Sequence, residues 1–190
     1  MKVLRFPVPF NVGSDIVHLP RISRVLAGKY ANRFVQRILR DEETADFRKR
    51  FHLTKSISGG SNPANGQQQD KRIIGDNFKT PGDLELTMTR WLAGRFAAKE
   101  AARKAAPLGA GSLSWKDILV RVEEQPSLDA GAASKVRGSR RPEVLYLRGY
   151  SDQAVKNAGE DAIARAGKLT ISHDGEYVVA TVLAPVEDDG

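Results

Sequence analysis

Two carboxylates lie at positions where a charge could take part in chemistry. Asp15 follows a glycine and a serine, at a point where the sequence predicts that a strand hands over to a helix. Such a junction can hold a charge at the mouth of a cleft, although a turn or capping aspartate is the commoner explanation of this pattern. Glu100 continues a series of apolar residues spaced four apart, so we expect it on the apolar side of a helix. The series is Met88, Leu92 and Phe96.

A lysine one helical turn after Glu100 offers a simpler interpretation of that residue. Lys104 stands four positions later, and Glu–Lys pairs at this spacing are common on alanine-rich helices, where each contributes ~0.2–0.5 kcal/mol. By spacing alone, this pairing is favoured. It does not explain why Glu100 lies on the apolar side of the helix, so both interpretations stay open.

A second hypothesis brings Asp15 and Glu100 together. Two neighbouring carboxylates repel each other unless a proton or a cation lies between them. The chain has no cysteine and only three histidines, so the cation would be a hard one such as Mg²⁺, which is typically held by one or two carboxylates, water and substrate phosphates. Basic residues around Glu100 could then receive phosphate oxygens. They are Arg95, Lys99, Arg103 and Lys104. This hypothesis favours a substrate that carries phosphate.

The composition excludes several classes of protein and site. The 190 residues are 41% hydrophobic and 28% charged, an ordinary globular composition in a chain long enough for one domain. The absence of cysteine excludes disulfides, a thiolate nucleophile and cysteine-ligated zinc or iron–sulfur sites. The sequence shows neither a secretory signal nor an apolar run of the roughly 20 residues that span a bilayer. We therefore expect a soluble intracellular protein.

Positive charge is concentrated in one stretch of the chain. The formal net charge is +7, which suits an anionic partner. Residues 21–55 hold ten Lys and Arg against four Asp and Glu, so ten minus four gives a local charge of +6. A non-catalytic nucleic-acid-binding module is therefore an alternative function. Regularly spaced stacking aromatics and a recognisable binding motif are missing from the sequence, which weakens that alternative.

The first forty residues predict a strand followed by a helix. The strand begins at Phe10 and runs into a polar tip at Asp15. Pro20 suits the first turn of a helix that extends to about Arg40. One face of this helix is apolar at every fourth residue, and its other faces are basic. The apolar residues are Ile22, Leu26, Tyr30, Phe34 and Ile38.

Two segments rich in small or polar residues lie before and after a second, longer predicted helix. Residues 57–82 are rich in Gly, Ser, Asn and Gln, and residues 126–142 are rich in small residues, so both are typical of mobile inserts. The helix begins at about Asp83, a candidate N-cap, and extends to Ala106. Its alanine-rich second half has a strong helix propensity, and Pro107 stops it.

The rest of the sequence predicts mostly strands. Residues 116–123 alternate between apolar and polar, and residues 144–147 read as a second strand. Residues 151–166 read as a helix that Gly167 ends, and Asp174-Gly175 joins two β-rich runs into a hairpin. The whole 190-residue chain is therefore expected to be a single α+β domain. It would have a mostly antiparallel sheet of about five strands with the long helix packed on it.

Three segments of the sequence resemble one family. Gly13-Ser-Asp-Ile-Val-His-Leu-Pro-Arg-Ile is similar to the opening signature of the 4′-phosphopantetheinyl transferases of the holo-acyl-carrier-protein synthase type. Arg95-Phe-Ala-Ala-Lys-Glu-Ala-Ala-Arg-Lys is similar to their second signature, and Thr170-Ile-Ser-His-Asp-Gly-Glu-Tyr-Val-Val-Ala is similar to their closing hairpin. The three motifs occur in the family's order and span nearly the whole chain. Their combination is therefore a specific match to the family, whereas any one motif alone is not.

The resemblance implies a Mg²⁺-dependent transfer reaction of fatty-acid biosynthesis. Coenzyme A donates its 4′-phosphopantetheine arm to a serine of an apo acyl carrier protein, and 3′,5′-ADP leaves. By this analogy Asp15 and Glu100 hold Mg²⁺ on the pyrophosphate. Lys104 neutralises charge on the phosphoryl group or helps to deprotonate the serine, with Glu100 as an alternative base. Further residues implied at the coenzyme A phosphates or beside its adenosine are Arg95, Lys99 and His173.

The same resemblance implies the partners of the enzyme. Acyl carrier proteins are small and acidic; Arg21 matches the position at which the family docks them, and Arg24 lies on the next turn. A homotrimer with coenzyme A in clefts between subunits is expected by analogy with bacterial relatives. Neither a membrane nor a nucleic acid is expected as a partner. The insert at 57–82 suggests a fungal mitochondrial member, whereas a bacterial one would be cytoplasmic.

The sequence departs from the family pattern near its first signature. His18 stands where bacterial relatives often carry Glu, and Asp15 is followed by Ile16-Val17 where the larger transferases have an Asp-x-Glu pair. A water is therefore expected at the third protein position around the metal. The transferase domain of a larger fatty-acid synthase is a further alternative for the chain as a whole.

Overall fold

The structure, a computed structural model, describes residues 9–51, 53, 82–122, 141–147 and 164–186. Of the two inserts that the sequence predicts, 57–82 and 126–142, it describes only Gly82 and residues 141–142. The prediction of two mobile inserts within one domain therefore falls almost wholly outside the described residues.

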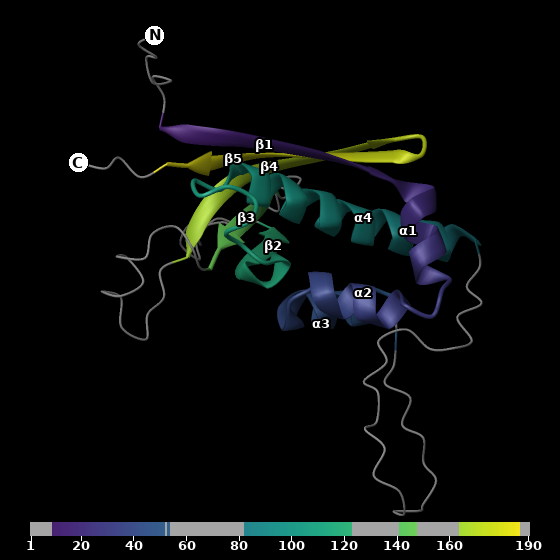
Figure 1. Ribbon diagram of the computed structural model, residues 1–190. Helices are drawn as coiled ribbons and strands as arrows, with labels where there is room; N and C mark the ends of the chain where they lie inside the picture. The colour runs from purple at the N-terminus through teal and green to yellow at the C-terminus, as the bar shows by residue number, and fades with distance from the viewer. Residues whose placement is uncertain (1–8, 52, 54–81, 123–140, 148–163, 187–190) are drawn as a thin grey trace, which may run out of the picture.

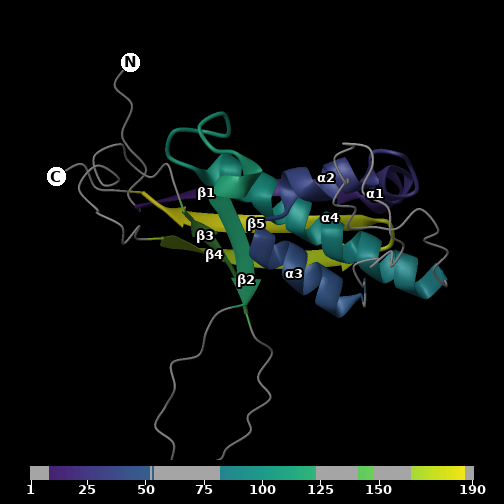
Figure 2. The same cartoon turned by 90° about the horizontal axis from the view of Figure 1, so that it is seen from below.

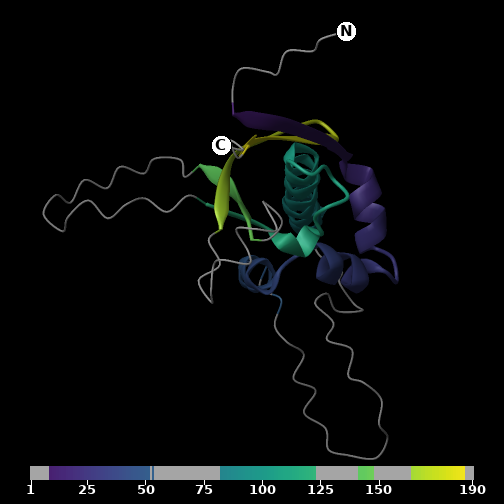
Figure 3. The same ribbon diagram turned by 60° about the vertical axis from the view of Figure 1, so that its left-hand side comes forward.

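Within the described residues, five antiparallel strands form one sheet in the order β1-β5-β4-β3-β2. They are β1 (Phe10–His18), β2 (Ile118–Val122), β3 (Pro142–Tyr146), β4 (Arg165–Asp174) and β5 (Tyr177–Pro185). Figure 3 shows the sheet curving around the long helix α4 (Gly82–Ala105), which lies on its concave face. The predicted α+β architecture, with about five mostly antiparallel strands and a long helix packed on them, is confirmed.

The alanine-rich helix α4 packs mainly against β1 and β5 (Figure 1). Small side chains allow the close approach, and six of its alanines are 0% exposed: Ala93, Ala97, Ala98, Ala101, Ala102 and Ala105. The helix begins at Gly82, one residue before the predicted N-cap, and ends one residue before the predicted Ala106. None of the described helices is both long and apolar enough to cross a membrane.

In the part of the chain that the structure describes, three short helices cover the sides of α4 that the sheet leaves open (Figures 2 and 3). They are α1 (Leu19–Leu26), α2 (Ala31–Ile38) and α3 (Asp41–Arg50). The prediction of one continuous helix from Pro20 to Arg40 is wrong, because the chain turns at residues 27–30, where the Gly28 N–H donates to the Val25 carbonyl at 3.2 Å. Tyr30, which the periodicity placed on the apolar face, lies in this turn and is 58% exposed.

The C-terminal hairpin is confirmed with a shift of one residue in its loop. Asp174 pairs with Tyr177, so the two loop residues are Gly175 and Glu176. Gly175 has a φ of 50°, a backbone conformation that favours glycine. The strand predicted at 116–123 is also confirmed, as β2.

The helix predicted at 151–166 lies mostly outside the described residues, but its predicted end is wrong. Arg165, Ala166 and Gly167 belong to β4. A β-carbon on Gly167 would lie 2.8 Å from the Val144 side chain and 3.0 Å from the Leu183 carbonyl oxygen. Glycine at this position therefore serves close strand packing and does not terminate a helix.

Candidate active site

Close packing of β1 on α4 depends on Gly13. A β-carbon on this residue would lie 2.0 Å from the Ala101 carbonyl oxygen and 2.7 Å from the Ala105 backbone nitrogen. Both distances are too short for any side chain, so only glycine lets the strand lie this close to the C-terminal half of the helix. Alternate residues of a strand face the same side of the sheet, so Asp15 also faces α4.

Asp15 forms an ion pair with Lys104, which lies 89 positions later in the sequence. Lys104 Nζ donates to Asp15 Oδ1 at 2.7 Å and to the Ser14 carbonyl oxygen at 2.9 Å. The Lys104 side chain is 47% exposed and the Asp15 side chain is 16% exposed, so solvent reaches the pair from the lysine side. The predicted place of Asp15 at a strand tip is wrong, because β1 continues to pair with β5 as far as His18.

Glu100 is held by two donors that differ from the predicted one. Its Oε1 accepts a hydrogen bond from Arg103 Nη1 at 2.8 Å and another from Trp115 Nε1. Trp115 begins η1 (Trp115–Asp117), the 3₁₀ turn before β2. The interpretation of Glu100 as the partner of Lys104 is wrong, since each of the two side chains bonds to a different residue.

The carboxylates of Asp15 and Glu100 each accept their hydrogen bonds through one oxygen. Within the described residues, Asp15 Oδ2 and Glu100 Oε2 accept no hydrogen bond. No group of three or more His, Cys, Asp or Glu in the described part of the chain is arranged to hold a metal ion. A cation at the two carboxylates would take its remaining ligands from water and substrate, a coordination that suits Mg²⁺. The donor set fits magnesium, and the convergence of both carboxylates on one ion stays a prediction.

Lys99 is fully buried beside α3. Its ammonium lies 2.5 Å from Glu43 Oε2 and donates to the carbonyl oxygens of Ile38 at 2.8 Å and Trp115 at 3.0 Å. Burial lowers the pKa of Lys99 to about 8, and the adjacent Glu43 carboxylate opposes the shift. The protein takes all three donors of this ammonium. The contact with coenzyme A phosphates implied by the family resemblance therefore stays a prediction without support from the geometry.

Glu43 connects three elements through the same buried carboxylate. Besides Lys99 of α4, it accepts hydrogen bonds from the backbone N–H of Arg40 at 2.9 Å and of Val120, in β2, at 3.2 Å. Its side chain is 2% exposed. A buried charge is tolerated only when it is paired and hydrogen-bonded, and here both conditions hold.

Arg95 is held on the side of α4 that faces α3. Its guanidinium carbon lies 4.6 Å from the centroid of the Trp91 ring, and Nη2 lies 3.8 Å from Asp46 Oδ2. Its side chain is 15% exposed, and burial lowers its pKa. The Arg95 Nε atom is buried and has no hydrogen-bond partner among the described residues. The predicted contact of Arg95 with coenzyme A stays a prediction.

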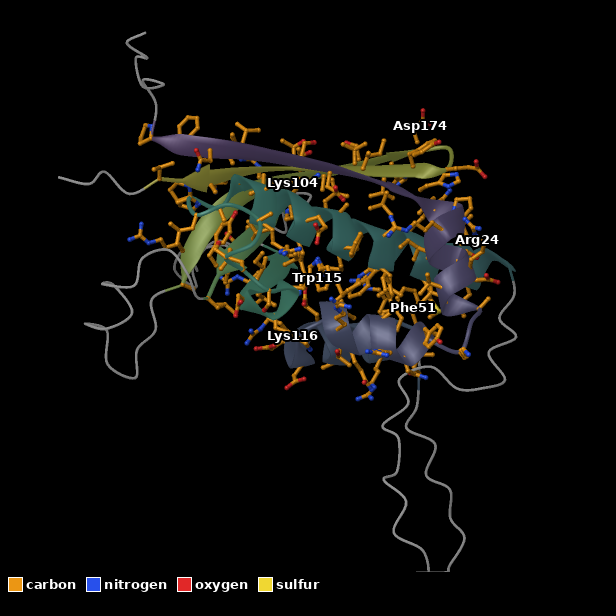
Figure 4. All side chains as sticks on the ribbon, viewed as in Figure 1. Arg24, Phe51, Lys104, Trp115, Lys116 and Asp174 are labelled. Atoms are coloured by element: carbon orange, nitrogen blue, oxygen red, sulfur yellow. The ribbon has the colours of Figure 1, made fainter. Side chains whose placement is uncertain are left out.

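His173 lies away from Asp15 and Lys104 within one chain. It stands on β4, and β5 separates that strand from β1. Its neighbour Asp174 lies at the end of the hairpin, apart from Lys104 in Figure 4. The described part of a single chain therefore does not bring His173 to the Asp15–Lys104 pair.

Arg21 and Arg24, the predicted docking residues, are both exposed on α1. Arg24 Nε donates to the Pro20 carbonyl oxygen one turn earlier at 3.3 Å, which leaves the rest of the guanidinium at the surface. The positions of both residues agree with a surface role, and a role in docking stays a prediction.

Comparison with known proteins identifies the family. A model described as the 4′-phosphopantetheinyl transferase superfamily matches residues 11–141, a span that includes Asp15, Glu100 and Lys104. The chain belongs to this superfamily. The family predicted from the three sequence motifs, and with it the enzyme class, is confirmed.

Individual relatives of this phosphopantetheinyl transferase support the assignment over nearly its full length. It is 49% identical to 4′-phosphopantetheinyl transferase B, mitochondrial, of Aspergillus fumigatus over 185 residues, 97% of this chain and 99% of that protein. It is 27% identical to the holo-[acyl-carrier-protein] synthase of Oceanobacillus iheyensis over 173 residues, 91% of this chain and 93% of that protein.

Solved structures of the same family share the fold. The holo-[acyl-carrier-protein] synthase of Neisseria meningitidis matches with a TM-score of 0.50 and 26% identity, covering 92% of this chain and 96% of that one. The holo-ACP-synthase of Plasmodium yoelii matches in fold with a TM-score of 0.51 and 21% identity, covering 94% and 95% of the two chains.

Sequence reasoning on this transferase missed Glu43 and Trp115. Glu43 counted only as one acidic residue in a basic stretch, and Trp115 belonged to no motif. Their partners, Lys99 and Glu100, are 56 and 15 positions away. The one local signal was a tryptophan in a polar segment immediately before a strand, a place where a side chain with an N–H donor usually has a partner.

Proposed function

We propose that this phosphopantetheinyl transferase moves the 4′-phosphopantetheine group of coenzyme A to a serine hydroxyl of an apo acyl carrier protein. The observation that carries the proposal is the ion pair of Asp15 and Lys104. These residues come from the first and second family signatures, 89 positions apart in the sequence, and lie 2.7 Å apart in space. The pair is open to solvent through Lys104, as a site for a phosphorylated substrate must be.

The transfer is a phosphoryl displacement. The serine oxygen attacks the phosphorus on the pantetheine side of the pyrophosphate and forms a new P–O bond. The bond from that phosphorus to the bridging oxygen breaks, and 3′,5′-ADP leaves with the bridging oxygen. Such a reaction needs positioning and charge stabilisation more than covalent chemistry. The half-exposed Lys104 supplies positive charge for the phosphoryl oxygens when it is an ammonium. The serine proton goes to Glu100, to a water, or to Lys104 as the neutral amine.

Asp15 and Glu100 are the proposed ligands of Mg²⁺, through the oxygens that accept no bond from the described residues. When bound, the ion supplies positive charge at the pyrophosphate oxygens. The other oxygen of Asp15, Oδ1, accepts a hydrogen bond from Lys104. The other oxygen of Glu100, Oε1, accepts hydrogen bonds from Arg103 and Trp115. These bonds fix the orientation of both carboxylates, which preorganises them for a ligand.

The four residues implied at coenzyme A fall into two groups. Lys104 and His173 are exposed and are the better candidates for direct contact. Lys99 and Arg95 form ion pairs with Glu43 and Asp46 respectively, and would have to leave these partners to reach a phosphate. We propose that these two cations support the site from within the fold.

The exposed arginines of α1 are the proposed docking surface for the acyl carrier protein. Arg21 and Arg24 lie at the surface, and Arg33 and Arg37 of α2 extend the positive charge. An acidic partner complements such a surface and is steered toward it. The nucleic-acid-binding alternative rests on the same charge and gains no further support from the described residues.

A homotrimer is the proposed assembly, supported by an apolar outer face on the sheet. Val12 and Ile16 of β1 are 62% and 63% exposed. They pair across the strands with Leu183 and Val179 of β5, which are 41% and 38% exposed. Contiguous apolar surface of this kind marks an interaction site, and further copies of the chain would bury it. The mitochondrial fungal relative supports a mitochondrial location for this chain as well.

The transfer is tested by intact-mass analysis of an apo acyl carrier protein incubated with coenzyme A. We expect a mass increase of one phosphopantetheine with Mg²⁺ and none with a chelator. Asp15→Ala, Glu100→Ala and Lys104→Ala are expected to lower the rate by about 10²–10³, the loss typical for removal of a charge-stabilising group. Asp41→Ala, which removes an exposed carboxylate of α3, is the matched control and should transfer normally. Full activity in Asp15→Ala or Glu100→Ala would refute the metal assignment.

A further inference from the structure

The indole of Trp115 makes a direct bond to one of the two active-site carboxylates. Its Nε1 donates to Glu100 Oε1, the same oxygen that accepts the bond from Arg103 Nη1. An indole has one donor and no acceptor, so this bond satisfies it completely. A hydrogen bond to a charged acceptor is stronger than one to a neutral group.

The Trp115 ring is itself held by two arginines. The guanidinium carbon of Arg37 lies 4.7 Å from the ring centroid, and that of Arg103 lies 5.1 Å from it. The Phe96 ring packs nearby, with its centroid 6.1 Å away. Figure 4 shows Trp115 between α4 and α2. Cations over an aromatic face and a packed neighbouring ring restrict how the indole can turn.

Arg103 joins the ring to the loop that carries it. Besides Glu100, it donates from Nε to the Leu113 carbonyl oxygen at 2.7 Å and from Nη2 to the Ala110 carbonyl oxygen at 2.7 Å. One side chain of α4 thus fixes the loop between α4 and η1 and also bonds to Glu100. The indole reaches Glu100 from a loop of fixed geometry.

The backbone of Trp115 is held by the buried ion pair of Lys99 and Glu43. Lys99 Nζ donates to the Trp115 carbonyl oxygen at 3.0 Å while it is paired with Glu43. Lys99 directly precedes Glu100 on α4, so neighbouring residues of one helix hold Trp115 at its carbonyl and at its indole. A pocket of about 470 Å³ leaves part of this region open, lined by Arg37, Arg103, Ser114, Trp115 and Lys116.

We propose that Trp115 is a positioning residue for Glu100, which fixes Oε1 and leaves Oε2 as the oxygen that binds Mg²⁺. The inference rests on the proposed function and deepens it. A carboxylate held in one orientation loses less rotational freedom when it takes a metal ion, so the ion binds more tightly. Trp115 touches neither substrate nor metal in this scheme and acts through Glu100.

The test is Trp115→Phe, which keeps an aromatic ring beside the two arginines and removes the N–H donor together with the second ring of the indole. We expect the Mg²⁺ concentration for half-maximal transfer to rise by about 10-fold or more, as for loss of a group that orients a metal ligand. The rate at saturating Mg²⁺ should stay within about 3-fold of the wild type, since the same carboxylate oxygen remains. Calorimetric titration with Mg²⁺ should show the same weakening without turnover. Trp91→Phe, which changes the other tryptophan, is the control and should leave both values unchanged.

An independent measurement observes the bond itself. In protein labelled with ¹⁵N-tryptophan, Trp91→Phe alone assigns both indole resonances, because the chain has two tryptophans. We expect the Trp115 resonance to move on Glu100→Gln substitution and on addition of Mg²⁺, while the Trp91 resonance stays in place. This measurement keeps Trp115 intact, so it decides the question even where Trp115→Phe fails to fold.

The outcomes separate the inference from the proposed function. The inference would be overturned if a folded Trp115→Phe variant showed the wild-type Mg²⁺ dependence, or if Glu100→Gln left the Trp115 resonance in place. Mg²⁺-dependent transfer by the wild type would be unaffected by either result. Absence of Mg²⁺-dependent transfer by the wild type would overturn the proposed function. The indole spectrum would still decide whether Trp115 holds Glu100.

Discussion

Gly13 of β1 lies so close to Ala101 of α4 that a β-carbon at position 13 would be 2.0 Å from the Ala101 carbonyl oxygen. We expect Gly13→Ala to push the strand off the helix and to destabilise the protein by about 1–3 kcal/mol or more, as other overpacked sites do. Because Asp15 is two residues away, the Asp15–Lys104 bond should open and transfer should fall by at least about 10-fold.

The matched control for this substitution is Gly94→Ala in the same helix. A β-carbon there would lie 3.7 Å from the Ile171 side chain, an ordinary contact distance. Alanine is the better helix former by about 0.5–1 kcal/mol, so this variant should be as stable as the wild type or more so. Thermal unfolding measures both variants, and equal stability of Gly13→Ala and the wild type would contradict the close packing of β1 on α4.

Lys99→Met should destabilise the protein by about 3–5 kcal/mol, because it leaves the Glu43 carboxylate buried without its partner. The double variant Glu43→Leu/Lys99→Met removes both charges and should recover much of that loss. Urea unfolding monitored by circular dichroism gives the free energy of unfolding for each variant. A single variant as stable as the double one would mean that the two charges are not coupled.

The same lysine predicts that stability rises with pH above neutrality. The pKa of Lys99 is lowered from 10.5 to about 8 in the fold. Between these values the unfolded chain binds more protons than the folded one, so the free energy of unfolding increases with pH. This contribution is complete above the unfolded pKa and is lost as the pH falls through about 8. The measurement is the free energy of unfolding of the wild type and of the Glu43→Leu/Lys99→Met variant between pH 7 and pH 10. The wild-type value minus the variant value isolates the contribution of Lys99. If this difference falls as the pH rises, the lowered pKa of Lys99 is contradicted.

Arg21→Glu should weaken the interaction with the acyl carrier protein and leave coenzyme A binding unchanged. A reversed charge on a docking surface repels an acidic partner, so the KM for the carrier is expected to rise about 10-fold. Lys49→Glu reverses an exposed charge on helix α3, outside the proposed docking surface, and serves as the control. Steady-state kinetics with each substrate varied in turn provide the measurement. If both variants raise the KM for the carrier equally, Arg21 contributes only to the general positive charge and is not a specific docking residue.

His173 is expected to act in the site of a neighbouring subunit, since β5 separates its strand from that of Asp15 within one chain. Asp15→Ala and His173→Ala should each be inactive alone. When the two variants are co-expressed, sites that combine an intact Asp15 with an intact His173 should restore about one quarter of the wild-type activity. Activity that stays absent in the mixed oligomer would place His173 in its own chain's site, and full activity of His173→Ala alone would remove it from the site.

Local motifs predicted Asp15, Glu100 and Lys104 as chemically important because each lies in a signature with distinctive neighbours. The partners of these residues could not be predicted as well. Spacing favoured a Glu100–Lys104 pair on one helix, but Gly13 brings β1 so close that Lys104 reaches Asp15 instead. Packing between elements outweighs a local pair worth ~0.2–0.5 kcal/mol.

The helices show the same limit of local reasoning. The apolar period of four continues from Ile22 to Ile38 across the turn at Gly28, so periodicity alone could not reveal the break between α1 and α2. Burial of Lys99 was also beyond the sequence, because a lysine in a basic motif ordinarily faces solvent. Its acceptors come from α2, α3 and η1, which only the folded chain brings together.

The pairing of β1 with β5 determines when this site can form during folding. Among the described strands, β1 lies at the edge of the sheet and pairs with β5 alone. Ser14 and Ala180, which meet there, are 166 residues apart. Contacts of such long range form late, because closing a long loop of chain carries a large entropic cost. A nascent chain that has not yet released β5 therefore cannot hold Asp15 in place through this pairing. Catalytic competence should emerge only after β5 has been synthesised, so chains that stop before β5 stay inactive.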